Sequence, residues 1–226
     1  RETFDSKFVR GDTASVRVFK QKSEETGVGF SSIAMSGFYA QSFAKRPTYK
    51  KMVSDCIEVM KTFNVEVAYL PLGTQGDLVK NPELRPAIVE RLRWAGKEVE
   101  KINGIIAVET SLPASEEKKL LEKIGNRNIK IAFNFSNAIE HGRDISKELK
   151  TLGRDNIGEI HASNTDGHWI ENDPEINLPQ IKETLDKMHW KGWLVVERSR
   201  DTSMVREVVK NYGANVRYLK KIFKNQ

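Results

Sequence analysis

The chain has 226 residues, of which 38% are hydrophobic and 30% charged, a composition typical of a folded globular protein rather than a disordered one. Its single cysteine, Cys56, excludes an intramolecular disulfide framework and zinc sites built from several cysteines. No apolar run approaches the roughly 18 residues that a membrane-spanning helix needs. The net charge of +6 comes from interspersed acidic and basic residues, which is typical of solvated helix faces and requires no nucleic-acid partner.

Apolar, β-rich runs alternate with longer amphipathic stretches along the chain. The helices are expected at about 13–25, 49–63, 81–102, 115–125, 144–152 and 178–188, with a last one ending near 223. The strands are expected at about 28–35, 65–70, 105–110, 129–135, 157–162 and 193–197. Alternation of this kind indicates parallel strands joined by helical crossovers.

Two α/β architectures fit this alternation: a (β/α)8 barrel and a doubly wound open sheet. No glycine-rich nucleotide fingerprint follows a strand, since the GTQG run at 73–76 lacks both its spacing and its context. Polar residues instead close successive predicted strands, namely Glu109, Asn134, His161 and Glu197. Barrel active sites are built at the carboxyl ends of the strands, so the sequence favours the barrel.

Glu109 and Glu197 each close an apolar strand. A carboxylate in that position is costly unless it is paired or bound to a metal, and a salt bridge to a neighbouring Lys or Arg is the structural alternative. Two such glutamates on different strands of one barrel can face each other across a substrate. That pair is suited to moving a proton on and off carbon.

His161 shares this end of the sheet with the two acids, which favours metal ligation over a purely structural role. Glu159 points to the same face by strand alternation, and could be a partner of His161, a substrate contact or half of an ion pair. The side-chain oxygen of Asn134 can ligate a hard cation. Asn134 and Asn137 could equally cap turns.

A long polar loop follows at 163–175. Its Trp169 could stack on the apolar face of a sugar or pack onto a neighbouring helix. Arg198 and Arg200, which come directly after Glu197, could bind a phosphate or carboxylate, or pair with Asp201.

Taken together, the strand segments and their flanks resemble the xylose isomerase-like barrel superfamily, in its sugar phosphate isomerase/epimerase branch. The resemblance covers the chain from about residue 13 and implies a single domain over 1–226. Its most specific segments are ISKELKTLGRDNIGEIHASNTDG and LPQIKETLDKMHWKGWLVVERSRD. The others are SEETGVGFSSIAMSG, FNVEVAYLPLG, IIAVET and IKIAFNFSNA.

The resemblance implies one divalent cation (Mn, Mg, Co or Zn) held by residues from the last four barrel strands. By segment the ligands would be Glu109, Asn134, His161 and Glu197, and the two glutamates would also be the catalytic acid and base. Asn134 stands where the family usually has Asp, so the ligand set would carry two negative charges instead of three. Weaker or differently selective cation binding is expected.

The resemblance also implies substrate-binding positions. Asn137 stands where the family often has a substrate-binding histidine. After the strand histidine the family often has an acid and then an arginine, whereas this chain has Asn164 and the pair His168 and Trp169. The residues expected to bind substrate are Asn137, Glu159, His168, Trp169 and Arg198.

In the family barrel the four ligand strands are the fifth to the eighth, so the strand near residue 28 would be the third. We therefore expect this chain to lack the first two β-α units, leaving the barrel domain incomplete at its N-terminal side. Eight parallel strands within the chain would refute that expectation.

The resulting hypothesis is an isomerase or epimerase of a keto sugar or sugar phosphate that works through an enediolate. A lyase or hydrolase acting on a keto-glycoside with the same site, and a non-catalytic sugar-binding member, are the alternatives. An abasic-site endonuclease is disfavoured, because its zinc site needs several histidines and only His161 closes a strand. We expect a small sugar as partner, no nucleic acid and no membrane span; a homodimer and the cellular compartment stay open.

Overall fold

A computed structural model describes Phe8 and residues 11–224 of the chain. Six parallel strands form one sheet in chain order. They are β1 (Ser32–Ala34), β2 (Val67–Pro71), β3 (Ile105–Glu109), β4 (Ile129–Asn134), β5 (Ile157–His161) and β6 (Leu194–Val195). Strands that follow one another in sequence are also neighbours in the sheet, which is the order of a (β/α) barrel and not of a doubly wound sheet.

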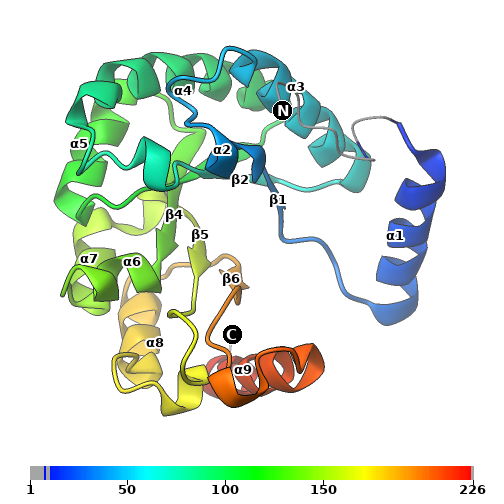
Figure 1. Cartoon of the computed structure of the whole chain (residues 1–226), viewed down its shortest axis with the longest axis vertical. Coiled ribbons are helices and arrows are strands. Elements are labelled where there is room, and N and C mark those ends of the chain that lie inside the picture. Colours follow the sequence, from blue (N-terminus) through cyan, green and yellow to red (C-terminus); the bar gives the residue numbers. More distant parts are fainter. Residues whose placement is uncertain (1–7, 9–10, 225–226) are drawn as a thin grey trace.

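The helices are α1 (Thr13–Thr26), α2 (Gly37–Ala40), α3 (Tyr49–Phe63), α4 (Arg85–Glu100), α5 (Ala114–Ile124), α6 (Phe135–Glu140), α7 (Ile145–Leu152), α8 (Leu178–Lys187) and α9 (Val208–Phe223). Helices α3, α4, α5, α7 and α8 follow the outer side of the curved sheet, and the ring of elements stays open between α1 and α9 (Figure 1). Within the described residues β1 and β6 each pair with only one strand, so the sheet forms part of a barrel. The predicted barrel-type α/β fold is confirmed, with six parallel strands.

The two faces of the sheet differ in what they bury. The convex face packs against the helices through large aliphatic side chains, such as Ile160 of β5 against Leu149 of α7. The concave face instead carries small residues, Ala107 and Ala132, with Val67 and Tyr69. Small side chains leave room inside the curve of the sheet, next to the carboxyl ends of the strands. No helix among the described residues is both long and apolar enough to cross a membrane.

The strands at the two ends of the sheet are shorter than the sequence predicts. Residues 28–35 and 193–197 are expected to be extended, but pairing is confined to Ser32–Ala34 and Leu194–Val195. Val28 and Trp193 are 67% and 49% exposed, so their apolar side chains lack the neighbour that would bury them in a strand. The prediction for 129–135 also runs one residue too far, because Asn134 ends β4 and caps the unpredicted helix α6.

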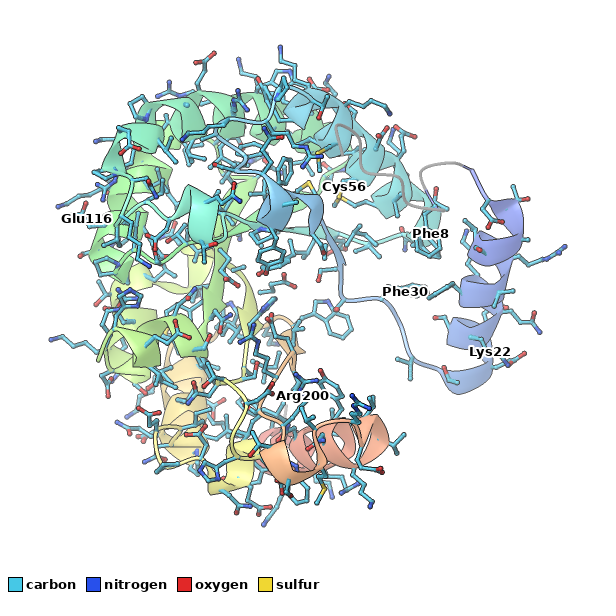
Figure 2. The ribbon with its side chains drawn as sticks, viewed as in Figure 1. Phe8, Lys22, Phe30, Cys56, Glu116 and Arg200 are labelled. Carbon is cyan, nitrogen blue, oxygen red and sulfur yellow. The ribbon has the colours of Figure 1, made fainter. Side chains whose placement is uncertain are left out.

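Helix α1 lies apart from the other helices and buries none of its residues (Figure 1). Local signals set its ends, since Asp12 accepts a hydrogen bond from the Ser15 amide at 3.0 Å and Gly27 ends the helix at a φ of 66°. Phe8 and Phe30 lie between α1 and the rest of the fold (Figure 2). Their packing on Phe63 of α3 forms a small apolar cluster.

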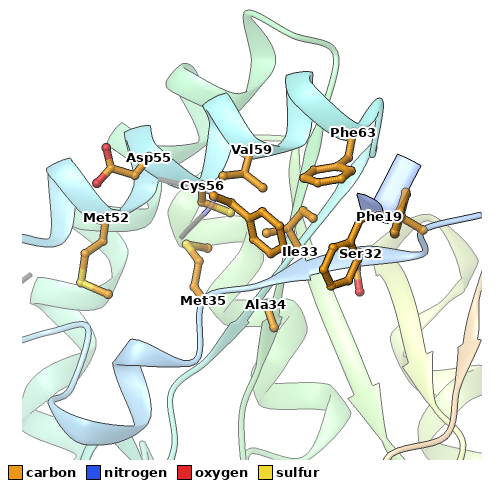
Figure 3. A pocket seen from close by; sticks show the side chains of 12 residues that line it. Phe19, Ser32, Ile33, Ala34, Met35, Met52, Asp55, Cys56, Val59 and Phe63 are labelled. Atoms are coloured by element: carbon orange, nitrogen blue, oxygen red, sulfur yellow. The ribbon is translucent and has the colours of Figure 1, made fainter. Parts of the chain in front are cut away.

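This cluster lines a pocket of about 280 Å³ between β1 and α3 (Figure 3). Its walls are mostly apolar, from residues such as Ile33, Met52 and Phe63, and the thiol of Cys56 is buried there. Asp55 is the carboxylate that lines it. The pocket does not bring together the polar residues that close the strands, so it is separate from the site that the sequence predicts.

Candidate active site

The polar residues that close the strands converge as the sequence predicts. Glu109, Asn134 and His161 are the last residues of β3, β4 and β5, and Glu197 lies two residues beyond β6. Ligand atoms of Glu109, His161 and Glu197 all lie within 4.8 Å of one another. Parallel strands bring their carboxyl ends to one edge of the sheet, which is why residues far apart in sequence meet here.

Glu109 is held by hydrogen bonds from neighbouring strands. The Tyr69 hydroxyl of β2 donates to its Oε2 at 2.5 Å, and Nδ2 of Asn134 donates to the same oxygen at 3.1 Å. The Tyr69 hydroxyl also lies 2.9 Å from that of Tyr39, whose side chain is partly exposed on α2. A chain of hydroxyl groups therefore connects Glu109 to the surface.

Both tyrosines keep their protons at neutral pH. Burial raises the pKa of Tyr39 to about 12. Burial, and then the negative charge of Glu109, raise the pKa of Tyr69 still further. Tyr69 can therefore act as a hydrogen-bond donor to the Glu109 carboxylate.

His161 bridges the two glutamates. Its Nδ1 lies 2.7 Å from Oε2 of Glu197 and 3.8 Å from Oε2 of Glu109, and its ring lies against that of Tyr69 with centroids 4.5 Å apart. Burial lowers the pKa of His161, but the carboxylates of Glu159 and Glu197 outweigh it and raise that pKa to about 9. The hydrogen bond from His161 in turn lowers the pKa of Glu197.

Glu159 lies behind His161, with its carboxylate fully buried and Oε1 3.5 Å from Nε2 of the imidazole. The sequence places it among the candidate substrate contacts. Because it has no exposed surface, its position fits the alternative that it is a partner of His161.

The two candidate asparagines make hydrogen bonds within the fold. Oδ1 of Asn134 accepts from the backbone and side chain of Ser136 at 3.0 and 2.8 Å, and so caps α6. Nδ2 of Asn137 donates to the Thr110 carbonyl at 3.0 Å. The contact of Asn134 matches the turn-capping alternative and leaves its amide nitrogen facing Glu109. The contact of Asn137 is not a turn cap, because it joins α6 to the residue that follows β3.

Some of the residues that the sequence predicts in the loops after β5 and β6 are held by contacts within the fold, and others are exposed. Nε1 of Trp169 donates to Asn211 of α9 at 2.8 Å, which favours helix packing over stacking on a sugar. His168 is exposed. Arg200 pairs with Asp166 at 2.6 Å, so the alternative of a pair with Asp201 is wrong.

Arg198 is exposed and makes no ion pair with any residue that the structure describes. Its charge is close enough to lower the pKa of Glu197, after the larger influence of His161. Of the predicted substrate-binding residues it is therefore the one that offers a free cationic group beside the glutamate cluster.

Hydrogen bonds to the backbone hold the segment around Glu197 in place. The Tyr212 hydroxyl of α9 donates to the Glu197 carbonyl at 2.7 Å. Two residues on, Ser199 adopts a φ of 59°, unusual for a residue with a side chain, and its hydroxyl accepts from the Asn164 amide at 2.8 Å. The loops after β5 and β6 are thereby joined.

Sequence reasoning missed Tyr39 and Tyr69. Tyr69 had a signal, because it is the last but one residue of the run VEVAYL and alternates onto the same face as Val67, where a buried phenol needs a partner. Tyr39 had none, because the four-residue helix α2 is not predicted.

The cluster suits a divalent cation. Two carboxylates and one imidazole offer the mixed oxygen and nitrogen ligands that Mn²⁺, Co²⁺ and Zn²⁺ accept, whereas Mg²⁺ prefers oxygen alone. The structure fits such an ion because each residue of the cluster offers one ligand atom and these atoms all lie within 4.8 Å of one another.

Comparisons with known proteins agree with this fold. The family model for the xylose isomerase-like TIM barrel matches residues 2–222. No curated protein sequence matches significantly. Among solved structures, 3-keto-D-glucoside 4-epimerase from E. coli shares 14% identity with a TM-score of 0.73, over 92% of this chain and 85% of that one.

Two further structures share the fold. A D-psicose 3-epimerase has 11% identity and a TM-score of 0.74, over 92% of this chain and 83% of that one. A sugar phosphate isomerase/epimerase from Parabacteroides distasonis has 12% identity and a TM-score of 0.68, over 91% and 75%. With the fold, the strand-end cluster and the family match in agreement, the chain belongs to the xylose isomerase-like TIM-barrel family.

Proposed function

We propose that the protein is a divalent-cation-dependent isomerase or epimerase of a keto sugar or sugar phosphate. The observation that carries the proposal is the convergence of Glu109, His161 and Glu197 at the carboxyl ends of three strands. Support comes from the names of proteins with the same fold, which include a 3-keto-D-glucoside 4-epimerase and a D-psicose 3-epimerase.

Glu109, His161 and Glu197 would hold the cation, which when bound would polarise the substrate carbonyl and stabilise negative charge on the enediolate oxygens. One of the two glutamates removes the proton from the carbon beside the carbonyl. The other returns a proton to the opposite face of that carbon in an epimerisation, or a proton is delivered to the neighbouring carbon in an isomerisation.

The surroundings of Glu109 support a role in proton transfer. Hydrogen bonds from Tyr69 and Asn134 fix the orientation of its carboxylate, which is 15% exposed. When Glu109 has taken a proton, it can pass one to the oxygen of Tyr69 while Tyr69 passes its own to Tyr39 and Tyr39 releases its own to water. No free phenolate is needed, because each hydroxyl gives one proton and receives one.

The position of Arg198 indicates a substrate that carries an anionic group. Its exposed guanidinium follows Glu197 directly and suits a phosphate or carboxylate, which it can bind with two parallel hydrogen bonds. In this proposal Arg198 binds the phosphate of a sugar phosphate at the rim of the site. The cluster of Glu109, His161 and Glu197 binds the end of the substrate that carries the carbonyl.

Elimination from a keto-glycoside is a second candidate reaction. It begins with the same proton abstraction and ends with loss of a leaving group instead of reprotonation. The similarity in fold to an enzyme named for a 3-keto-D-glucoside favours including such substrates. A non-catalytic sugar-binding role is a third candidate, favoured by Asn134, whose oxygen is engaged in capping α6.

The test is an activity screen of the purified protein with and without added Mn²⁺, Co²⁺ or Zn²⁺. The panel contains D-fructose, D-psicose, D-tagatose, their phosphates, and 3-keto-glycosides, and products are separated by chromatography and identified by NMR. Cation-dependent formation of an isomer or epimer supports the proposal. Elimination products support the second candidate, and binding of a sugar without turnover supports the third.

A further inference from the structure

The carboxylate of Glu159 is buried in an unusual way. Its residue exposes no surface, and neither of its oxygens has a hydrogen-bond partner among the described residues. Nε2 of His161 lies 3.5 Å from Oε1. Burying a carboxylate without partners costs free energy, so Glu159 does not contribute to folding in the way that a buried apolar residue does.

The backbone directs Glu159 to this position. Ile157 pairs with Ile131, and Glu159 pairs with the next residue, Ala132, so Gly158 is an extra residue in β5. Such a bulge changes where the following side chains point and is common next to active sites. Glu159 therefore shares the concave face of the sheet with Ala132, below the cluster.

Gly158 is needed for this arrangement. A Cβ at this position would lie 2.9 Å from the Cβ of Ala107 on β3, closer than side chains can approach. Glycine therefore lets the bulged strand pack closely against its neighbours. Gly158 and Glu159 together therefore place a carboxylate behind His161.

The two nitrogens of His161 face different groups. Nδ1 faces Glu197 at 2.7 Å and Glu109 at 3.8 Å, whereas Nε2 faces Glu159. An imidazole that donates a hydrogen bond from one nitrogen to a carboxylate keeps the other nitrogen available as a ligand, and such carboxylate partners set the orientation of metal-binding histidines.

We propose that Glu159 is a positioning residue, which accepts a hydrogen bond from Nε2–H of His161 and so presents Nδ1 to the point where Glu109 and Glu197 converge. This deepens the proposed function, and it rests on that function for the statement that a cation binds at Nδ1. Loss of such a partner typically weakens metal binding by about 10- to 100-fold.

The first experiment is a calorimetric titration with Mn²⁺ and Zn²⁺ of the wild type, Glu159→Leu and Glu159→Gln. We expect Glu159→Leu to weaken cation binding by about 10- to 100-fold. Glu159→Gln should fall between Leu and the wild type, because its amide oxygen can still accept a hydrogen bond but carries no charge. Unfolding curves should show all variants folded, since each removes a buried charge without a good partner.

Glu117→Gln is the matched control. Glu117 is also a buried glutamate, but its carboxylate accepts a hydrogen bond from the Thr110 hydroxyl at 2.7 Å and lies outside the cluster. Its substitution should leave cation affinity within about twofold. Equal cation affinity in Glu159→Leu and the wild type would overturn the proposal.

A second measurement needs no cation. The chain has four histidines, so the ring nitrogens of His161 can be assigned by ¹⁵N NMR with a His161→Asn variant. In the cation-free wild type, Nε2–H of His161 should exchange with solvent at least about tenfold more slowly than in Glu159→Leu. Equal exchange rates would overturn the role of Glu159. If the wild type binds no cation, the cation dependence of the proposed function fails while this measurement still decides the proposal.

Discussion

The two glutamates of the cluster are held in different ways. Glu109 ends a five-residue strand between two paired neighbours, and two side chains donate hydrogen bonds to its carboxylate. Glu197 lies beyond the two-residue strand β6, and in the part of the chain that the structure describes its carboxylate is hydrogen-bonded to one side chain, that of His161. The side chains are 15% and 36% exposed.

This difference shows how one site can combine a fixed group with an accessible one. A carboxylate fixed by neighbours needs little reorganisation when it receives a proton from carbon. A more exposed carboxylate can exchange its proton with water between turnovers. For the proposed reaction we therefore propose that Glu109 abstracts the proton and that Glu197 returns it.

The largest expected effect is at these two carboxylates. Glu109→Gln and Glu197→Gln keep the shape of the side chain but cannot take up a proton, so each should lower kcat by about 100- to 10,000-fold. Steady-state kinetics on the substrate found in the screen measures this loss, and circular dichroism checks the fold. Wild-type activity in either variant would contradict the assignment of both roles.

Tyr69→Phe should have the next largest effect. It removes the hydroxyl that donates to Glu109 at 2.5 Å while keeping the ring that lies against His161. Loss of a hydrogen bond to a charged group corresponds to about 1.5–3 kcal/mol, or roughly a 10- to 100-fold drop in kcat. Tyr39→Phe, one hydroxyl further away, should cost less. An unchanged kcat in Tyr69→Phe would show that Glu109 does not need the hydrogen bond from Tyr69.

Arg198→Ala should discriminate between substrates. If its guanidinium binds a phosphate, KM for a phosphorylated substrate should rise by about tenfold while KM for the free sugar stays constant. Arg206→Ala, which removes another exposed arginine of the same segment, is the matched control. Equal changes for both substrates would remove Arg198 from substrate binding.

The smallest expected effect is on the free energy of unfolding, through the buried Glu117. Burial raises the pKa of Glu117 to about 8, so the folded chain holds this proton more tightly than the unfolded chain, whose Glu has a pKa near 4.5. The stabilisation is complete below about pH 4.5 and is lost as the pH rises through about 8.

Glu117→Gln keeps an acceptor for Thr110 but removes this titration. Between pH 5 and 8 the unfolding free energy of the wild type should fall by roughly 1–3 kcal/mol relative to the variant. Urea unfolding at several pH values measures the difference. Parallel curves for the two proteins would show that Glu117 is ionised in the folded chain at neutral pH.

The central part of the site could be predicted from the sequence because the carboxyl ends of parallel strands meet by topology. Glu109, Asn134, His161 and Glu197 each follow a recognisable apolar run, so their convergence needs no knowledge of side-chain contacts. The order of the strands in the sheet follows from the same alternation.

The rest of the site depends on packing that no short pattern encodes. The contact of Tyr39 with Tyr69 joins residues 30 positions apart through an unpredicted helix. The pairing of Arg200 with Asp166 joins two loops, whereas the sequence offers Asp201, the adjacent acid, as one possible partner. The lengths of β1 and β6 depend on how far the ends of the sheet are buried, and the sequence pattern of a strand does not predict that burial.

The most direct test of the central claim is solvent hydrogen exchange at carbon. The cation-loaded protein is incubated in D₂O with the panel of keto sugars and sugar phosphates, and deuterium beside the carbonyl is measured by NMR and mass spectrometry. We expect deuterium to be incorporated only when the cation is present, and we expect no incorporation in Glu109→Gln. A protein that binds both cation and sugar but exchanges no hydrogen on any member of the panel would contradict it.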